Sequence, residues 1–169
     1  MLSQHRKPVS LSLMAFDLPL WSMVETAATV YQKDSEQFHI LLTEPVVHSH
    51  SEPAVHSSFR SATEQDILTI PAPPPRLLWI EVSPYRITMT MQGNGRFSYR
   101  HFWERGVYGL NRYWLQRGSG QRNEQIRLRN FTRNLTLEGQ PLPEHLRLEY
   151  ELWTGNLRLG HYVMNLEVH

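Results

Sequence analysis

The chain has 169 residues, of which 40% are apolar and 20% charged, a balance typical of one folded domain. Its 17 basic and 16 acidic side chains give a net charge of +1, so the overall composition favours no particular partner. The absence of cysteine excludes disulfides, thiolate metal sites and cysteine nucleophiles. No apolar run approaches the roughly 18 residues of a membrane helix, so we expect a soluble, cytoplasmic protein without membrane insertion.

The N-terminal part of the chain predicts strands and one ambiguous segment. Within residues 9–16, the polar Ser10 and Ser12 alternate with apolar side chains and Asp17 closes the segment, which is the period of a half-buried strand rather than of a signal peptide. Between residues 21 and 42 the pattern is mixed. Met23, Ala27 and either Val30 or Tyr31 fit a helical spacing, whereas residues 38–42 indicate a short buried strand.

A flexible connector rich in His, Ser and Pro follows near residues 45–65, and a proline-rich turn follows at residues 71–75. The connector holds the best metal-ligand candidates, His48, His50 and His56, because His-x-His places two imidazoles on one strand face. Serine neighbours favour an exposed loop instead. We therefore predict no metal site.

The central part of the chain predicts a strand at residues 77–82 and then a hairpin. The hairpin joins residues 85–91 to residues 96–103 through a Gly-Asn-Gly turn at residues 93–95, which supplies the positive φ that tight turns require. Residues 104–116 fit either a helix or a strand, and their two glycines favour an extended segment.

The C-terminal part of the chain predicts a long strand at residues 125–137 and a second hairpin. The hairpin joins residues 146–152 to residues 157–168, and its apolar parity switches at Gly160, which predicts a β-bulge there. The chain is therefore expected to be one mainly-β domain over residues 1–169, an antiparallel barrel or sandwich built from hairpins, with at most one or two short helices. A β-rich α+β domain is the alternative.

The near-zero net charge hides a strong polarity along the chain. Residues 1–75 carry four basic and eight acidic groups, residues 76–133 carry eleven arginines and three glutamates, and residues 134–169 carry two basic and five acidic groups. The regional charges are therefore about −4, +8 and −3.

Strand alternation places many of these arginines on the polar face of the sheet. Arginine pairs bidentately with carboxylates and phosphates, so the face is predicted to dock an acidic protein surface, in a non-enzymatic assembly or regulatory role. Binding of RNA or single-stranded nucleic acid by the same face is an alternative. A solvated face with arginines paired to cross-strand glutamates is the simplest alternative. The predicted partner-binding residues are Arg86, Arg96, Arg100, Arg127, Arg129, Arg133, Phe102 and Phe131.

A third hypothesis is a barrel that holds a small ligand in a cavity lined with aromatic side chains. The alternative is that these rings only fill the core. The candidate cavity residues are Tyr85, Tyr99, His101, Trp103, Trp114, Tyr150 and Trp153.

The sequence carries no catalytic signature. The serine at position 119 lacks the spacing of a nucleophile elbow, and no phosphate-binding loop is present. Glu149 and Glu151 share one strand face and are expected to be surface charges, while His161 shares the parity of Leu157 and Leu159 and is expected to be a core residue. We predict neither an enzyme nor a cofactor, and the pattern does not predict an oligomeric state.

Overall fold

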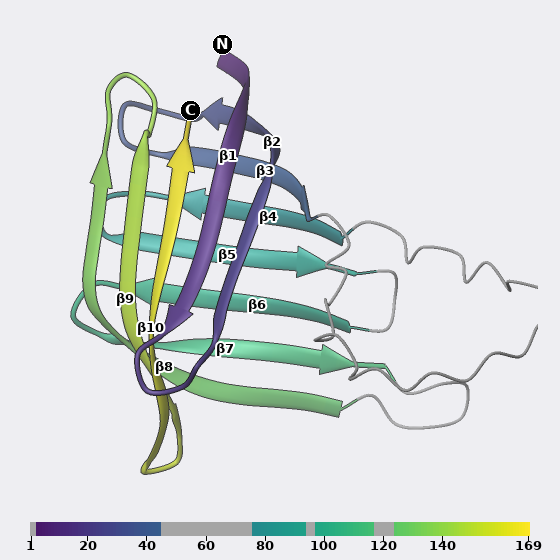
Figure 1. Ribbon diagram of the computed structural model, residues 1–169, viewed down its shortest axis with the longest axis vertical. Coiled ribbons are helices and arrows are strands. Elements are labelled where there is room, and N and C mark those ends of the chain that lie inside the picture. Colours follow the sequence, from purple (N-terminus) through teal and green to yellow (C-terminus); the bar gives the residue numbers. More distant parts are fainter. Residues whose placement is uncertain (1–2, 45–75, 94–96, 117–123) are drawn as a thin grey trace, which may run out of the picture.

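The structure is a computed structural model and describes residues 3–44, 76–93, 97–116 and 124–169 (Figure 1). Ten antiparallel strands form a closed barrel, and no helix occurs among the described residues. Each strand pairs with the next along the chain, and pairing of β1 with β10 closes the barrel. The strands are β1 (Ser3–Ala15), β2 (Trp21–Gln32), β3 (Phe38–Glu44), β4 (Arg76–Val82), β5 (Arg86–Gln92), β6 (Phe97–Glu104), β7 (Tyr108–Leu115), β8 (Glu124–Glu138), β9 (His145–Thr154) and β10 (Leu157–Val168).

The predicted mainly-β fold built from hairpins is confirmed, and the structure is a barrel rather than a sandwich. The ambiguous segment after residue 20 forms β2 and β3. Met23, Ala27 and Tyr31 are spaced by four residues, and a spacing of four also keeps side chains on one face of a strand. The helical spacing was therefore compatible with a strand.

Two β-bulges interrupt the ladders. The predicted bulge at Gly160 is confirmed by a register shift between Arg158 and Gly160. A second shift, between Thr132 and Asn134 in β8, was not predicted. The segment 104–116 is not helical: it turns at residues 105–107 and then forms β7.

Several sequence predictions lie outside the described residues. These are the connector near residues 45–65 with its three histidines, the proline-rich turn at 71–75, residues 94–95 of the Gly-Asn-Gly turn, Arg96, and the serine at position 119.

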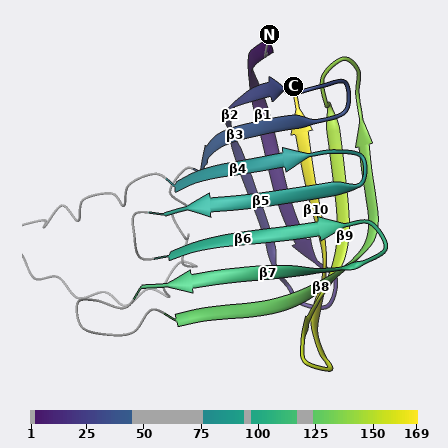
Figure 2. The same ribbon diagram turned by 180° about the vertical axis from the view of Figure 1, so that it is seen from behind.

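The barrel is flattened into two layers that cross at a steep angle. In Figures 1 and 2, β4 to β7 and the first half of β8 run across β9, β10 and β1. Apolar side chains from both layers fill the space between them. Nearly inaccessible members include Val30, Ile40, Ile80, Ile87 and Leu148.

Among the residues that the structure describes, no helix has the length and apolarity needed to cross a membrane.

Candidate functional site

Three arginines lie side by side on the outer face of β6, β7 and β8. Arg100 is directly opposite Arg112, and Arg112 is directly opposite Arg127. All three are exposed, and we call them the arginine row. Like charges directly opposite one another destabilise a sheet. The simplest alternative, neutralisation by cross-strand glutamates, therefore does not apply to these three residues.

Within the described residues, no acidic side chain pairs with the arginine row. In the described part of the chain, none of the three forms an ion pair with a carboxylate. The guanidinium of Arg127 donates to the neutral amide oxygen of Gln125, over 2.8 and 3.1 Å. Arg112 was not among the predicted partner-binding residues. If residues 108–115 had been predicted as a strand, alternation would have placed Arg112 on the same outer face as the other arginines.

The other predicted arginines that the structure describes point outward but are engaged within the protein. Arg86 pairs with Glu104 over 3.3 Å, and its guanidinium lies over the ring of Phe102, 5.3 Å from the ring centroid. The guanidinium of Arg129 lies 4.6 Å from the centroid of the Tyr108 ring, and Arg129 also donates to the backbone carbonyl of residue 155. These arginines stabilise the surface and have less freedom to bind a partner.

The third engaged arginine, Arg133, belongs to a cluster around a buried carboxylate. Glu151 accepts hydrogen bonds from Arg133, over 2.9 Å to its Nε, and from Arg158 and Trp153. The second predicted aromatic contact, Phe131, packs against Tyr108 with ring centroids 5.0 Å apart. The expectation that Glu151 is a surface charge is wrong, because these three side chains cover it to 6% exposure.

This cluster yields a pH prediction. Burial raises the pKa of Glu151, but the hydrogen bond and charge of Arg133, with Trp153 and Arg158, outweigh burial and hold the pKa below its usual value of 4.5. The carboxylate therefore stabilises the fold above pH 4.5, and this contribution is lost as the pH falls through the lower pKa of the folded state. Glu151→Gln is expected to cost about 1–2 kcal/mol at neutral pH. Urea unfolding should show the cost shrinking in acid, and a pH-independent cost would contradict this assignment.

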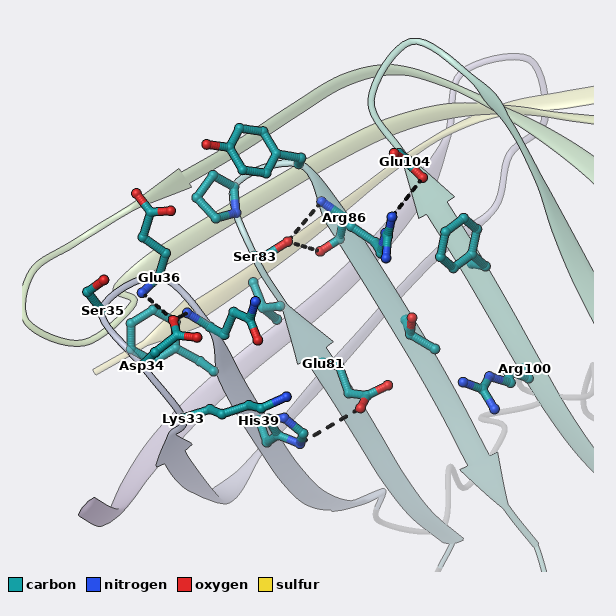
Figure 3. A pocket seen from close by; sticks show the side chains of 17 residues that line it. Lys33, Asp34, Ser35, Glu36, His39, Glu81, Ser83, Arg86, Arg100 and Glu104 are labelled. Atoms are coloured by element: carbon teal, nitrogen blue, oxygen red, sulfur yellow. Dashed lines mark hydrogen bonds and ion pairs between the residues drawn. The ribbon is translucent and has the colours of Figure 1, made fainter. Parts of the chain in front are cut away.

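A groove of about 800 Å³ continues the arginine row across β5 toward the β2–β3 turn (Figure 3). Arg86, Arg100 and Phe102, three of the predicted partner-binding residues, form one side of it. The turn forms the other side, where the Asp34 carboxylate accepts the backbone N–H groups of residues 36 and 37 over 2.9 and 2.8 Å. Asp34 thereby fixes the shape of the turn.

The charges around the groove differ in how well they are compensated. Glu104 is paired with Arg86, and Glu81 lies 4.0 Å from the Nδ1 atom of His39. For Lys33 and Arg100 no carboxylate partner occurs in the described ranges, and Figure 3 shows Arg100 apart from the Arg86–Glu104 pair. The groove and the arginine row therefore share Arg100, which no carboxylate in the described part of the chain neutralises. No group of side chains able to hold a metal ion occurs within the described ranges.

The predicted cavity residues divide between the two faces of the barrel. Tyr99, His101, Trp103 and Tyr150 point inward and are brought together, with centroids 4.5 Å apart for Tyr99 and His101 and 5.2 Å apart for Trp103 and Tyr150. The other three lie outside.

The three outward aromatics correct the prediction. Trp114 shares the parity of Arg112, Trp153 that of Glu151, and Tyr85 is 62% exposed in the turn before β5. Alternation relative to the neighbouring charged residues was the signal that would have placed Trp114 and Trp153 outside. Tyr85 shares the parity of the inward Ile87 and lies outside because it precedes the strand.

The inward rings form an interior polar cluster with further residues from β7 and β8. Tyr113 and Asn111 face inward from β7, opposite Tyr99 and His101. The side-chain N–H of Asn130 donates to the side-chain Oδ1 atom of Asn111 over 2.6 Å. The cluster comprises Tyr99, His101, Trp103, Asn111, Tyr113, Asn130, Thr132 and Tyr150.

Four atoms of this cluster are buried without a hydrogen-bond partner among the described residues: His101 Nε2, Trp103 Nε1, Asn130 Oδ1 and Thr132 Oγ1. Each such atom costs about 1–3 kcal/mol if nothing binds it. The sequon that begins at Asn130 cannot carry a glycan on this fold, because Asn130 is fully buried.

Comparison with known proteins establishes the fold. The chain is similar to the crystal structure of the ywiB protein from Bacillus subtilis, with a TM-score of 0.56, 12% sequence identity, and coverage of 97% of this chain and 93% of that chain. At this identity the similarity concerns the fold alone. No protein-family model matches the chain, and no curated protein matches it in sequence.

Proposed function

We propose that this protein is a binding protein without enzymatic activity, and that its outer face docks an acidic segment of another protein. The observation that carries the proposal is the arginine row, in which Arg100, Arg112 and Arg127 are juxtaposed across three strands. Repulsion between these three positive charges lowers the stability of the sheet. A partner that supplies carboxylates offsets the repulsion on binding, and each guanidinium can hold a carboxylate through two parallel hydrogen bonds.

The groove gives the partner a place to lie. It is about 800 Å³ in volume, and Arg100 belongs both to the groove and to the row. A partner chain in the groove meets the uncompensated cations Lys33 and Arg100, and then continues across the row. An assembly or regulatory role follows from such a peptide-docking surface.

An acidic protein is favoured over nucleic acid as the partner. Binding of single strands relies on exposed rings on which bases stack. Of the two outward rings beside the row, Phe102 is covered by the guanidinium of Arg86, and Trp114 is only partly exposed. In addition, the net charge of +1 gives no general attraction for a polyanion.

Charge reversal of Arg112 and Arg127 tests the proposal. The double variant Arg112→Glu/Arg127→Glu is expected to lose the partner in affinity purification from the native source, with an unchanged circular dichroism spectrum. Arg129 is unsuitable for this purpose, because its guanidinium contacts Tyr108 and the turn after β9.

The matched control is Arg6→Glu/Arg147→Glu, which changes the net charge equally but lies on β1 and β9, in the other layer of the barrel. It should retain the partner. Retention of the partner by the arginine-row variant would overturn the proposal. A partner released by ribonuclease, with affinity that falls steeply with salt, would assign the face to RNA instead.

A further inference from the structure

A second hollow, the Trp79 pocket, adjoins the groove on the outer face of β2, β3 and β4. Its volume is about 390 Å³, within the range of pockets that bind small groups. The side chains that line it are those of Tyr31, Lys33, His39, Leu41 and Trp79. Lys33 and His39 also line the groove, so the two hollows are continuous along the surface.

Trp79 is exposed and yet held in a fixed orientation. It is 46% exposed. Its indole N–H donates to Nδ1 of His39 over 3.1 Å, and the two rings meet edge-on with centroids 5.6 Å apart. Leu41 lies directly opposite Trp79 on β3. Because the indole ring is already fixed, little conformational freedom is lost when a partner side chain packs against it.

The Trp79 pocket lies on the same line across the strands as the arginine row. Trp79 is directly opposite Thr90 on β5, and Thr90 is directly opposite Arg100 on β6. Glu81 lies two residues further along β4, off this line, where it is 4.0 Å from Nδ1 of His39. A segment that crosses the strands along this line therefore passes from the arginines over the uncharged Thr90 to Trp79.

We propose that the docked acidic segment carries a large apolar side chain, the anchor, which packs into the Trp79 pocket. This deepens the proposed function and rests on it. Neighbouring strands are about 4.8 Å apart, so about 10 Å separates the backbones at Arg100 and Trp79, which an extended chain spans with about three residues. Lys33 at the pocket disfavours a cationic anchor and favours the acidic residues on either side of an apolar one.

Two synthetic peptides test this proposal. Each has four glutamates flanked on both sides by two glycines and then by one terminal residue, phenylalanine in the first peptide and alanine in the second. The anchor is thus three residues from the nearest glutamate in either binding direction. Titration of the ¹⁵N-labelled protein measures both affinities. The phenylalanine peptide is expected to bind about tenfold tighter, and to shift the indole signal of Trp79 but not that of the exposed Trp21.

Variants separate the pocket from the arginine row. Trp79→Ala is expected to abolish the preference for phenylalanine, and Leu41→Thr to reduce it, which keeps the test usable if the first variant fails to fold. Trp21→Ala removes another exposed tryptophan and should keep the preference. Arg112→Glu/Arg127→Glu should weaken both peptides alike and leave the preference unchanged.

Equal affinity of the two peptides, with both weakened in the arginine-row variant, would overturn this inference and leave the proposed function standing. A preference that persists in both Trp79→Ala and Leu41→Thr would also overturn it. N-acetylphenylalanine amide that binds as tightly as the phenylalanine peptide would assign the pocket to a small uncharged molecule instead. A Trp79 signal that shifts with protein concentration alone would assign it to a second copy of this chain. Failure of both peptides to bind would overturn the inference together with the proposed function.

Discussion

Replacement of Gly109 by alanine is expected to lower the free energy of unfolding by about 3 kcal/mol. A Cβ atom at this position would overlap the backbone carbonyl oxygen of Phe102 and lie 2.8 Å from Oδ1 of Asn130. The backbone of β6 cannot move away without loss of strand pairing, and overpacking of this kind costs about 1–3 kcal/mol. The clash would also displace the Asn130 amide, which donates to Phe102 over 2.9 Å and to Asn111. Each lost hydrogen bond adds about 1 kcal/mol.

Urea unfolding of Gly109→Ala, Asn130→Ala and the double variant measures this effect. Because the overlap with the Phe102 carbonyl does not involve the Asn130 side chain, the double variant should be no more stable than Gly109→Ala. A loss below about 1 kcal/mol, within the range of ordinary surface substitutions, would show that the close approach of β7 to β6 is described wrongly.

Acidification from pH 7.5 to pH 5 is expected to cost about 2 kcal/mol of stability through His101 alone. Burial lowers its pKa from 6.5 to about 3 in the folded protein. In the unfolded chain the imidazole is protonated below pH 6.5, whereas in the folded chain it stays neutral until about pH 3. The unfolded state therefore binds more protons between these values, and stability falls as the pH falls through this window.

The variant His101→Phe keeps a ring at the position and removes the titration. Its unfolding free energy is expected to lose this part of the pH dependence, while His5→Gln, at an exposed position on β1, should retain it. Equal pH slopes in the wild type and in His101→Phe would contradict the burial of a neutral imidazole.

Alternation along the chain predicted the strands well, because a closed barrel has one buried and one exposed face on every strand. The hairpins β5–β6 and β9–β10 and the bulge at Gly160 followed from turn residues and from the change of apolar parity. The bulge in β8 was not predicted, since Thr132 and Asn134 flank it with no change in polarity.

His161 shows how a bulge misleads a prediction of burial. In the sequence His161 has the same parity as Leu157 and Leu159, which come before the register shift is complete. The shift turns His161 outward, where its Nε2 atom lies 2.8 Å from the carboxylate of Glu149. The expectation of a core histidine was therefore wrong for His161.

The candidate site depended on strand register, which the sequence did not specify. Parity placed Arg100 and Arg127 on the outer face, but only the register brings both beside Arg112. Conversely, Arg86 and Arg129 have the predicted parity and are engaged with Glu104 and Tyr108. Parity alone could not separate free arginines from paired ones.

Site-specific photo-crosslinking tests the central claim, that the outer face docks an acidic protein segment, most directly. A photoreactive phenylalanine at Thr90, which lies directly opposite Arg100 on β5, would be compared with the same residue at Ser12 on β1. The account predicts a crosslink from position 90 to a protein segment rich in Asp and Glu. This crosslink should be absent from position 12 and lost in Arg112→Glu/Arg127→Glu. A crosslink that persists in this variant, or one that joins RNA rather than protein, would contradict it.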